Sequence, residues 1–354
     1  MDAILLVGGK GTRLRPLTAT TPKPMLPAAG VPFITHQLAR ARDAGVDHVI
    51  LATSYRSEVF SEYFGDGSRV GLRIDYVHEV EPLGTGGGIG NVAHLLDAKP
   101  DDPVVILNGD VLSGHDLTAQ VDAHQASGAA VTLHLTEVDD PRAFGCVPTD
   151  ADSRVTAFLE KDPNPVTNRI NAGCYIFRRS VIDSIPTGRP VSVERETFPG
   201  LLAEGTLILG YVEIAYWLDL GTPAAFIRGA CDLVLGHAPG AVDRPGESLV
   251  LAGADVVADA GLSGGTCIGT GTSVGHATLH GAVVFDGARI GDGCVIRDSV
   301  IGANAHIGDG VVLDGVVIGD GATIGDGCEL LTGARVWPRA VLAPGSVRFS
   351  SDSG

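Results

Sequence analysis

The stretch LVGGKGTRLRPLTATTPKPMLP, residues 6–27, joins a short apolar run to a loop that is rich in glycine and basic residues. The apolar run, residues 4–7, is continuous, which is typical of a strand buried in a parallel sheet. Further strand-like runs, among them residues 48–52, 73–78 and 104–107, alternate with stretches of helical spacing up to about residue 235. This alternation predicts βαβ units, and therefore an α/β fold with a Rossmann-like, mostly parallel sheet flanked by helices.

The loop after the first strand has the residue types of an anion site. Gly8, Gly9 and Gly11 carry no side chains, so a ligand can approach their backbone N–H groups closely. Arg13 and Lys23 add charge that can bind phosphate oxygens. The loop matches neither the Walker pattern nor G-x-G-x-x-G. A tight turn with solvated basic residues is the alternative, but glycines, cations and a proline-rich segment coincide here, which favours a phosphate-binding loop.

A second glycine-rich stretch, EPLGTGGGIG at residues 81–90, follows the strand predicted at residues 73–78. A flexible connection is the simple interpretation, whereas a base-binding edge is the alternative, since glycines let a flat heterocycle lie against the backbone. Glu79 or Glu81 could accept hydrogen bonds from the N1–H and N2–H₂ donors of guanine; uracil and thymine offer only one such donor.

Two aspartates are candidate metal ligands. Asp110 directly follows the apolar run at residues 104–107, so it lies at the carboxyl end of a predicted strand, where ligands bind in such sheets. A carboxylate there suits Mg²⁺, although Asn-Gly-Asp is also favourable turn chemistry. Asp219, at the end of the strand-like residues 211–219, is the second candidate.

Three strand-like pieces, residues 144–147, 158–161 and 171–175, suggest a site for a sugar phosphate. Glu160 could accept hydrogen bonds from sugar hydroxyls, and the neighbouring Lys161 could bind the phosphate. A solvated Glu-Lys pair at a strand end is the ordinary explanation of these two residues taken alone.

Residues 236–248 are rich in Gly and Pro and read as a linker between a catalytic domain, residues 1–235, and a second domain, residues 249–354. In this second domain an aliphatic residue recurs about every six positions, at Ile290, Ile296, Ile301, Ile307, Leu313, Ile318, Ile324, Leu330, Val336 and Leu342. Such a hexapeptide repeat predicts a left-handed parallel β-helix, with each aliphatic side chain pointing inward. The five-residue steps from Ile296 and from Leu313 should be local corners. Exposed coil edges favour a homo-oligomer.

Composition excludes several classes of protein. The chain has 354 residues, 44% of them hydrophobic, and a formal net charge of −17. Such an acidic chain argues against nucleic acid and anionic membranes as partners. The six cysteines form no C-x-x-C motif, which predicts reduced, buried thiols. The N-terminal apolar run is too short for a signal peptide and nothing approaches 18 apolar residues, so we expect a cytoplasmic protein.

Taken together, GGKGTRLRPLT and PKPMLP resemble the signature of the sugar-1-phosphate nucleotidylyltransferases. The resemblance implies Mg²⁺-dependent transfer of a nucleotidyl group from an NTP to a sugar 1-phosphate, with release of pyrophosphate. The residues predicted to be catalytic are Arg13, Lys23, Asp110 and Asp219, with Asp110 and Asp219 as the metal ligands. The predicted nucleotide-binding residues are Leu6, Gly8, Gly9, Gly11, Thr12, Arg13, Lys23, Glu79, Gly84, Thr85 and Asp110. The predicted sugar-phosphate-binding residues are Gly145, Glu160, Lys161, Asn171 and Gly173.

The whole chain resembles members of this family that use GTP and mannose 1-phosphate, notably their actinobacterial form. The segments PLGTGGG, NGDVLSG, FGCVPTD, NAGCY and SVERETFP carry this resemblance. The pattern departs at Asp162, where the family usually has proline. Adenylyl-, uridylyl- or thymidylyltransferases of glucose 1-phosphate are the close alternative, because they share the same core.

Two alternatives belong to other classes. Hexapeptide β-helices occur in acyltransferases, which usually need a histidine base, and His276, His280 and His306 lie in this part of the chain. We expect all three to be surface residues of the coil. The second alternative is a catalytically silent regulatory homologue that binds nucleotide sugar; the presence of Arg13, Lys23, Asp110 and Asp219 argues against it.

Overall fold

The computed structural model describes the whole chain except residues 55, 160–163, 243 and 349–354. It contains two compact units, residues 1–9 with 37–217 and residues 10–36 with 218–354. The predicted domain boundaries at residues 235 and 248 stay a prediction. Among the described residues, no helix is long and apolar enough to cross a membrane.

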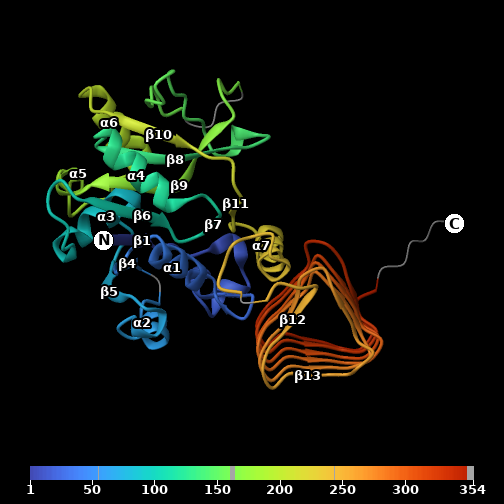
Figure 1. Ribbon diagram of the computed structural model, residues 1–354. Coiled ribbons are helices and arrows are strands. Elements are labelled where there is room, and N and C mark those ends of the chain that lie inside the picture. The colour runs from blue at the N-terminus through green and yellow to red at the C-terminus, as the bar shows by residue number, and fades with distance from the viewer. Residues whose placement is uncertain (55, 160–163, 243, 349–354) are drawn as a thin grey trace. The chain divides into compact units, whose positions relative to one another are not determined.

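The first unit contains a seven-stranded sheet in the order β10-β8-β9-β6-β1-β4-β5 (Figure 1). Its strands are β1 (Asp2–Leu6), β4 (His48–Thr53), β5 (Arg73–His78), β6 (Pro103–Asn108), β8 (Val131–Glu137), β9 (Arg169–Arg178) and β10 (Ile208–Val212). All neighbours pair in parallel except at β9, which is antiparallel to both β6 and β8. The predicted Rossmann-like, mostly parallel sheet is therefore confirmed.

Helices and short strands complete the first 219 residues of the chain, of which residues 10–36 and 218–219 belong to the second unit. The helices are α1 (Phe33–Asp43), α2 (Glu58–Phe64), α3 (Gly84–Val92), α4 (Leu117–Ser127), α5 (Arg179–Asp183) and α6 (Phe198–Ala203). The short strands are β2 (Pro27–Ala28), β3 (Val31–Pro32), β7 (Val111–Ser113) and β11 (Trp217–Asp219). Apolar strand residues such as Ile4 and Ile106 form the core of the first unit with Phe177 and Phe198. The core therefore lies at the centre of the sheet, where α3 contacts β1 and β4.

The second glycine-rich stretch is mostly helical, so the prediction of a loop over residues 81–90 is only partly right. Gly84–Val92 forms α3. A Cβ added to Gly86 would lie 2.8 Å from Cγ1 of Val191, and one added to Gly88 would lie 2.8 Å from Oε1 of Glu79. These glycines therefore permit close packing, which outweighs the low helix propensity of glycine.

Three other predicted elements differ from the structure. Of the pieces at residues 144–147 and 158–161, only an isolated bridge between Cys146 and Leu159 is present in the described part. Residues 211–219 are divided between β10 and β11. The stretch SVERETFPGLLA, residues 192–203, is predicted from the sequence to be a short helix, and in the structure it begins as a π-helix, η7 (Val193–Thr197), before α6. Pro199, in the first turn of α6, has no N–H group to continue a regular α-helical ladder.

The second unit contains three parallel sheets of short strands, which in Figure 1 form a coil of triangular section. The first sheet contains β12 (Ser248–Val250), β15 (Thr266–Ile268), β18 (Val283–Val284), β21 (Val300–Ile301), β24 (Val317–Ile318) and β27 (Arg335–Val336). The second contains β13 (Asp255–Val256), β16 (Ser273–Val274), β19 (Arg289–Ile290), β22 (His306–Ile307), β25 (Thr323–Ile324) and β28 (Val341–Leu342). The third contains β14 (Gly261–Ser263), β17 (Thr278–His280), β20 (Val295–Arg297), β23 (Val312–Asp314) and β26 (Glu329–Leu330).

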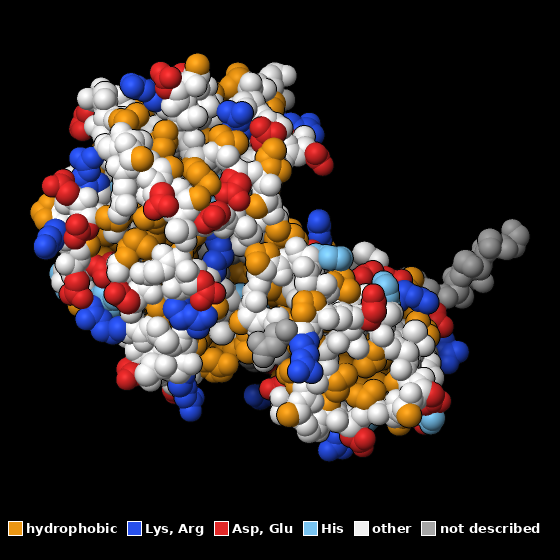
Figure 2. Space-filling model, in the orientation of Figure 1, with side chains coloured by type: hydrophobic (Ala, Val, Ile, Leu, Met, Phe, Trp, Pro, Cys, Tyr) orange, Lys and Arg blue, Asp and Glu red, His pale blue; other side chains and the backbone are white. Residues whose placement is uncertain are grey.

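The predicted aliphatic residues line the inside of this coil. Ile290, Ile307 and Ile324 are register partners on successive strands of the second sheet, and all three are buried. Hydrophobic side chains gather within the triangular outline of the coil in Figure 2. The shortened steps end at one corner, where Asp298 and Gly315 have φ of 42° and 64°. The arrangement is consistent with the predicted left-handed β-helix of hexapeptide repeats.

The repeated Gly-Asp-Gly turns have a direct structural cause. Oδ1 of Asp309 accepts a hydrogen bond from the backbone N–H of Asp292 (2.9 Å), and Oδ1 of Asp326 accepts one from Asp309 (3.0 Å). Each pair is 17 residues apart, so the carboxylates form a ladder from coil to coil. A Cβ on Gly291 or Gly308 would overlap the carboxylate oxygen of the next coil. Glycine precedes aspartate because no side chain fits there.

The last helix, α7 (Pro223–Leu235), packs against the first sheet of the coil. The rings of Phe226 and Phe285 meet edge to face at 6.4 Å. Thr222 followed by Pro223 predicts an N-cap and a first helical residue, and the structure confirms this, since Oγ1 of Thr222 accepts a hydrogen bond from the N–H of Ala225 (3.2 Å). All six cysteines of the chain are buried and free, as predicted.

Candidate active site

The loop that carries the predicted phosphate-binding cations is folded into three short 3₁₀ turns, η1 (Thr12–Leu14), η2 (Leu17–Ala19) and η3 (Lys23–Met25). Gly11 precedes the first turn in the left-handed region, at φ 54°, and its carbonyl accepts a hydrogen bond from Oγ1 of Thr18 (2.8 Å). Leu14 is fully buried, whereas Arg13 is exposed. The apolar residue therefore anchors the turn and leaves the arginine side chain accessible.

The structure brings Arg13, Lys23 and Asp219 together within the second unit. Nζ of Lys23 lies 3.8 Å from Oδ1 of Asp219. A Cβ placed on Gly221 would lie 2.9 Å from a guanidinium nitrogen of Arg13 and 3.0 Å from Oδ1 of Asp219. Two cations thus surround one carboxylate, which leaves a local excess of positive charge in an acidic chain. This charge suits a ligand that carries several phosphates.

In the first unit, Asp110 follows β6 as predicted. Gly109 donates its N–H to the carbonyl of Leu6 (2.9 Å), and a Cβ on Gly109 would lie only 2.7 Å from that oxygen. The glycine lets the chain turn closely over the end of β1 and directs Asp110 to the carboxyl end of the sheet. The carbonyl of Leu6, predicted to bind nucleotide, accepts this internal hydrogen bond.

Glu79 lies beside the first glycine loop. Its carboxylate is 8% exposed, accepts the N–H of Leu83 (3.2 Å) and lies 3.9 Å from the Cβ position of Gly8. Burial raises the pKa of this carboxyl group. Glu81, the alternative, is exposed. Ser54, which no sequence pattern indicates, also lies here, and its Oγ accepts the N–H of Gly9 (3.3 Å).

Thr85 connects the start of α3 to residues 193 and 194 by hydrogen bonds. Its Oγ1 donates to a carboxylate oxygen of Glu194 (3.0 Å) and accepts the N–H of Val193 (3.0 Å). Gly84 has φ 72°, and a Cβ there would lie 2.7 Å from the carbonyl oxygen of Val191. The start of α3 is therefore joined tightly to the segment that leads into η7.

A cavity of about 210 Å³ adjoins this segment. Its lining residues are Asn108, Phe144, Gly145, Cys146, Val147, Phe158, Leu159, Asn171 and Glu194. Two of the residues predicted to bind the sugar phosphate, Gly145 and Asn171, are among them. Glu160 and Lys161 lie outside the described residues. Glu194 was missed, because SVERETFP was interpreted only as a helix and as part of the whole-chain resemblance.

Asn171 shapes this cavity through its amide group. Its Nδ2 donates to the hydroxyl of Tyr175 (2.8 Å), and its Oδ1 accepts the N–H of Gly173 (3.0 Å). Gly173 has φ 76°, which favours glycine. Trp217 packs edge to face on Phe144, with the ring centroids 5.3 Å apart.

Asp110 and Asp219 fit the predicted Mg²⁺ by the chemistry of their donor atoms, because this ion prefers carboxylate oxygens. They belong to different compact units. Another group of ligating side chains, Asp2, His48 and Asp97, lies at the opposite end of β1. His48 is already hydrogen-bonded to Asp2 (3.0 Å), so this group has a structural explanation.

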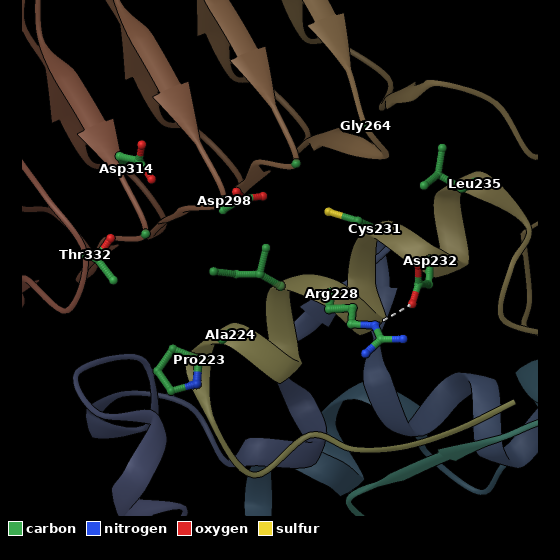
Figure 3. Close-up of a pocket in the computed structure, with 13 residues that line it drawn as sticks. Pro223, Ala224, Arg228, Cys231, Asp232, Leu235, Gly264, Asp298, Asp314 and Thr332 are labelled. Atoms are coloured by element: carbon green, nitrogen blue, oxygen red, sulfur yellow. Dashed lines mark ion pairs between the residues drawn. The ribbon is translucent and has the colours of Figure 1, made fainter. Parts of the chain in front are cut away.

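A cavity beside α7 contains none of the predicted site residues. It measures about 490 Å³ and lies between one face of α7 and a corner of the coil (Figure 3). Cys231 points into it, and Arg228 pairs with Asp232 at 3.5 Å. Burial raises the pKa of the Cys231 thiol to about 12, so the group stays protonated at neutral pH.

The three coil histidines lie at the surface, as expected. His276 is exposed and pairs with Asp259 at 2.7 Å. His280 contacts Oγ of Ser263 (3.0 Å), and His306 points outward from β22. This arrangement gives no support to the acyltransferase alternative.

Comparison with known proteins supplies the family. A model described as "Nucleotidyl transferase" matches residues 2–234. The chain belongs to the nucleotidyl transferase family. This confirms the predicted family and enzyme class. A second model, described as "GMPPB C-terminal domain", matches residues 245–346.

Individual relatives support the same conclusion. The chain is 58% identical to a mannose-1-phosphate guanylyltransferase of Mycobacterium tuberculosis, across 99% of this chain and 98% of the relative. It is 40% identical to the catalytic subunit beta of a mannose-1-phosphate guanylyltransferase of Xenopus tropicalis, across 65% of this chain and 64% of that one.

Solved structures agree with the fold of the first two thirds of the chain. HddC from Yersinia pseudotuberculosis, also solved in complex with GMP-PN, is 28% identical, with a TM-score of 0.56 over 66% of this chain and 99% of that one. A putative glucose-1-phosphate thymidylyltransferase from Bacillus anthracis is 22% identical, with a TM-score of 0.59 over 65% of this chain and 94% of that one, and shows likeness of fold alone.

Proposed function

We propose that this chain is a mannose-1-phosphate guanylyltransferase, which converts GTP and α-D-mannose 1-phosphate into GDP-mannose and diphosphate. The observation that carries the proposal is the 58% identity to the Mycobacterium tuberculosis relative of that name, which extends over 99% of the chain. A relationship of that length includes both the nucleotidyl transferase region and the coil. It favours GTP and mannose 1-phosphate over the adenylyl, uridylyl and thymidylyl alternatives.

The reaction joins two anions, so positive charge and positioning are its main requirements. An oxygen of the sugar 1-phosphate attacks the α-phosphorus of GTP, the new P–O bond forms, and the bond to the β-phosphate breaks to release diphosphate. The nucleophile is already ionised at neutral pH, so no strong general base is needed. Arg13 and Lys23, close together around Asp219, would neutralise charge on the α-phosphate and the departing diphosphate.

Mg²⁺ would be held by Asp110 and Asp219 and would supply further charge neutralisation. Asp219 lies beside Lys23 and can therefore orient the lysine toward phosphate. Gly109 permits the close turn that places Asp110 at the end of β6.

The remaining predicted residues divide between the base and the sugar. Glu79, buried beside Gly8, is the proposed acceptor for the guanine N1–H and N2–H₂ donors. Gly145 and Asn171 line the cavity of about 210 Å³, to which we add Glu194 as an acceptor for mannose hydroxyls. Thr85 would act indirectly, by holding Glu194 in place.

A panel of four NTPs, each tested with mannose 1-phosphate and with glucose 1-phosphate, tests the proposal through pyrophosphate release. GTP with mannose 1-phosphate should give the highest kcat/KM. Equal or better turnover with UTP or dTTP would refute the guanylyl assignment. If no pair of substrates were turned over, the result would favour the catalytically silent regulatory homologue. Turnover of acetyl-CoA would favour the acyltransferase alternative.

A homo-oligomer formed through the coil is part of the same proposal. Exposed apolar side chains on the last coils, such as Trp337 and Val341, support it. Light scattering of the purified chain should give a mass that is a multiple of 36.4 kDa; a mass of 36.4 kDa at all concentrations would contradict it.

A further inference from the structure

The loop that carries Arg13 and Lys23 belongs to the same compact unit as the β-helix. Residues 10–36 group with residues 218–354. At the end of this segment, Gly30 contacts the coil so closely that a Cβ there would lie 2.8 Å from Cδ2 of Leu251. Two further contacts, both polar, reach the part of the segment that contains the catalytic cations.

The first polar contact comes from Arg335, an outward-facing residue of β27. Its Nη1 donates to the carbonyl oxygens of Arg13 (2.9 Å) and Arg15 (2.8 Å). These two residues flank the buried Leu14, so one guanidinium holds both sides of the turn η1. Hydrogen bonds from a charged donor are stronger than those between neutral groups.

The second polar contact comes from Asp320. Its Oδ1 accepts the N–H of Ala303 (2.9 Å), in the same way as the aspartates of the coil ladder. Its Oδ2 accepts a hydrogen bond from the hydroxyl of Thr20 (2.6 Å). Asp320 therefore makes one hydrogen bond within the coil and a second one to the catalytic loop. The ladder bonds of Asp309 and Asp326, by contrast, run from coil to coil.

We propose that Arg335 and Asp320 are positioning residues for the nucleotidyl transfer, and that the β-helix acts as the support on which the triphosphate-binding loop is held. Arg335 does not touch substrate. It fixes the backbone of Arg13, and through that backbone the direction of the guanidinium that lies against Gly221 and Asp219. The inference rests on the proposed function, since it assigns a consequence to the position of Arg13.

The position of Arg13 matters because its role is electrostatic. Donors that meet developing charge must already lie in place, and displacement by about 1 Å can reduce turnover on the order of 100-fold. An exposed 3₁₀ turn of three residues has few hydrogen bonds of its own with which to hold such a position. The two bonds from Arg335 supply that rigidity.

The test compares Arg335→Met with Arg289→Met in the full-length chain. Met matches the length of the arginine stem and removes every donor, and Arg289 faces outward from β19 on another sheet of the same coil. Arg335→Met should lower kcat about tenfold, with the KM for mannose 1-phosphate changed less than twofold. Arg289→Met should leave both values and the thermal midpoint unchanged.

A double-mutant cycle with Arg13→Ala separates positioning from a general loss of structure. If Arg335 acts through Arg13, adding Arg335→Met to Arg13→Ala should cost little further activity. Thr20→Val removes the hydroxyl that donates to Asp320 and therefore tests the second polar contact. This variant should also lower kcat. Losses that multiply in the double variant, or kcat values equal to that of Arg289→Met, would overturn the inference.

Amide hydrogen exchange gives a readout that does not depend on turnover. Peptides that cover residues 10–27 should exchange faster in Arg335→Met and at the wild-type rate in Arg289→Met. If the wild-type chain turned over no NTP, the proposed function would fail while this measurement still tested the support of the loop. Unchanged exchange over residues 10–27 in Arg335→Met would refute the inference even in an active enzyme.

Discussion

Nζ of Lys23 lies 3.8 Å from Oδ1 of Asp219, and the side chains are 11% and 30% exposed. Residues from the beginning and the end of the nucleotidyl transferase region therefore form one charged group. Because Arg13 contacts the same carboxylate region through Gly221, the group carries a net positive charge before substrate or metal arrives. Its composition explains how a chain with a net charge of −17 can bind polyphosphate.

Lys23→Met should reduce kcat/KM for GTP by roughly 100-fold, since removing one fixed donor to a developing anion typically has this effect. It also leaves Asp219 without its lysine partner. The matched control is Lys10→Met, a lysine of the same loop that is exposed and has no predicted role. Steady-state pyrophosphate release checks both, and equal losses in the two variants would show that loop charge alone is responsible.

Asp110→Asn should raise the Mg²⁺ concentration needed for half-maximal activity and lower kcat by at least about 100-fold at saturating metal. The amide keeps the shape of the side chain and removes the charge that a divalent cation needs. Asp101→Asn, an exposed change near the opposite end of β6, should leave the Mg²⁺ titration as it was. Wild-type kinetics for Asp110→Asn would disprove the assignment of this residue to the metal.

Stability should fall as the pH falls below about 6.5. Burial, with the nearby cations Arg178 for His124 and Arg40 for His115 and His134, lowers the pKa of His124 and of His134 to about 4 and that of His115 to about 2. The unfolded chain binds protons at these groups near pH 6.5, whereas the folded chain binds them near pH 4 at His124 and His134 and near pH 2 at His115, so protonation favours unfolding. Each of His124 and His134 should contribute roughly 3 kcal/mol to this loss by pH 4.

Urea unfolding at a series of pH values measures the effect. His124→Gln should reduce the mean slope of the unfolding free energy between pH 6 and 4 by about 1 kcal/mol per pH unit. The exposed His94→Gln serves as the control and should not change it. A slope that is the same in both variants would mean that His124 is protonated in the folded state.

Gly308→Ala should destabilise the coil by about 1–3 kcal/mol, because the new methyl group overlaps Oδ1 of Asp326 and the two coils must separate. Gly246→Ala has no atom nearer than 3.8 Å to its Cβ and should cost little. Thermal unfolding of the two variants gives the comparison. Equal midpoints would imply that the coils move apart without strain.

The sequence was sufficient wherever one periodic pattern dominated. Apolar runs located β1, β4, β5 and β6, and the six-residue spacing located the coil, because each inward aliphatic residue contacts an equivalent residue in the next turn. Gly109 and Gly221 show the limit. Their importance comes from atoms distant in the chain, the carbonyl of Leu6 and the guanidinium of Arg13, which no local pattern reveals.

The same limit explains the errors around α3 and Glu194. A run of glycines predicts a loop by propensity, yet packing against Val191 makes it a helix. Glu194 enters the candidate site because Pro199 favours an irregular π-helical start to the helix after Ser192. Tertiary contacts determine both the helix α3 and the position of Glu194, so neither could be predicted from the sequence alone.

The segment of residues 10–36 touches the coil at two levels, near β12 through Gly30 and Leu251 and at β27 through Arg335. The first sheet has six strands from β12 to β27, so five strand spacings, about 24 Å, separate these levels. The number of coils is thereby matched to the length of the loop. Deleting one complete 17-residue coil would preserve the aliphatic repeat and still shift Arg335 by about 4.8 Å from Arg13. A free-standing hexapeptide domain could gain or lose coils without consequence. In this chain, the catalytic loop that the coil supports restricts the number of coils.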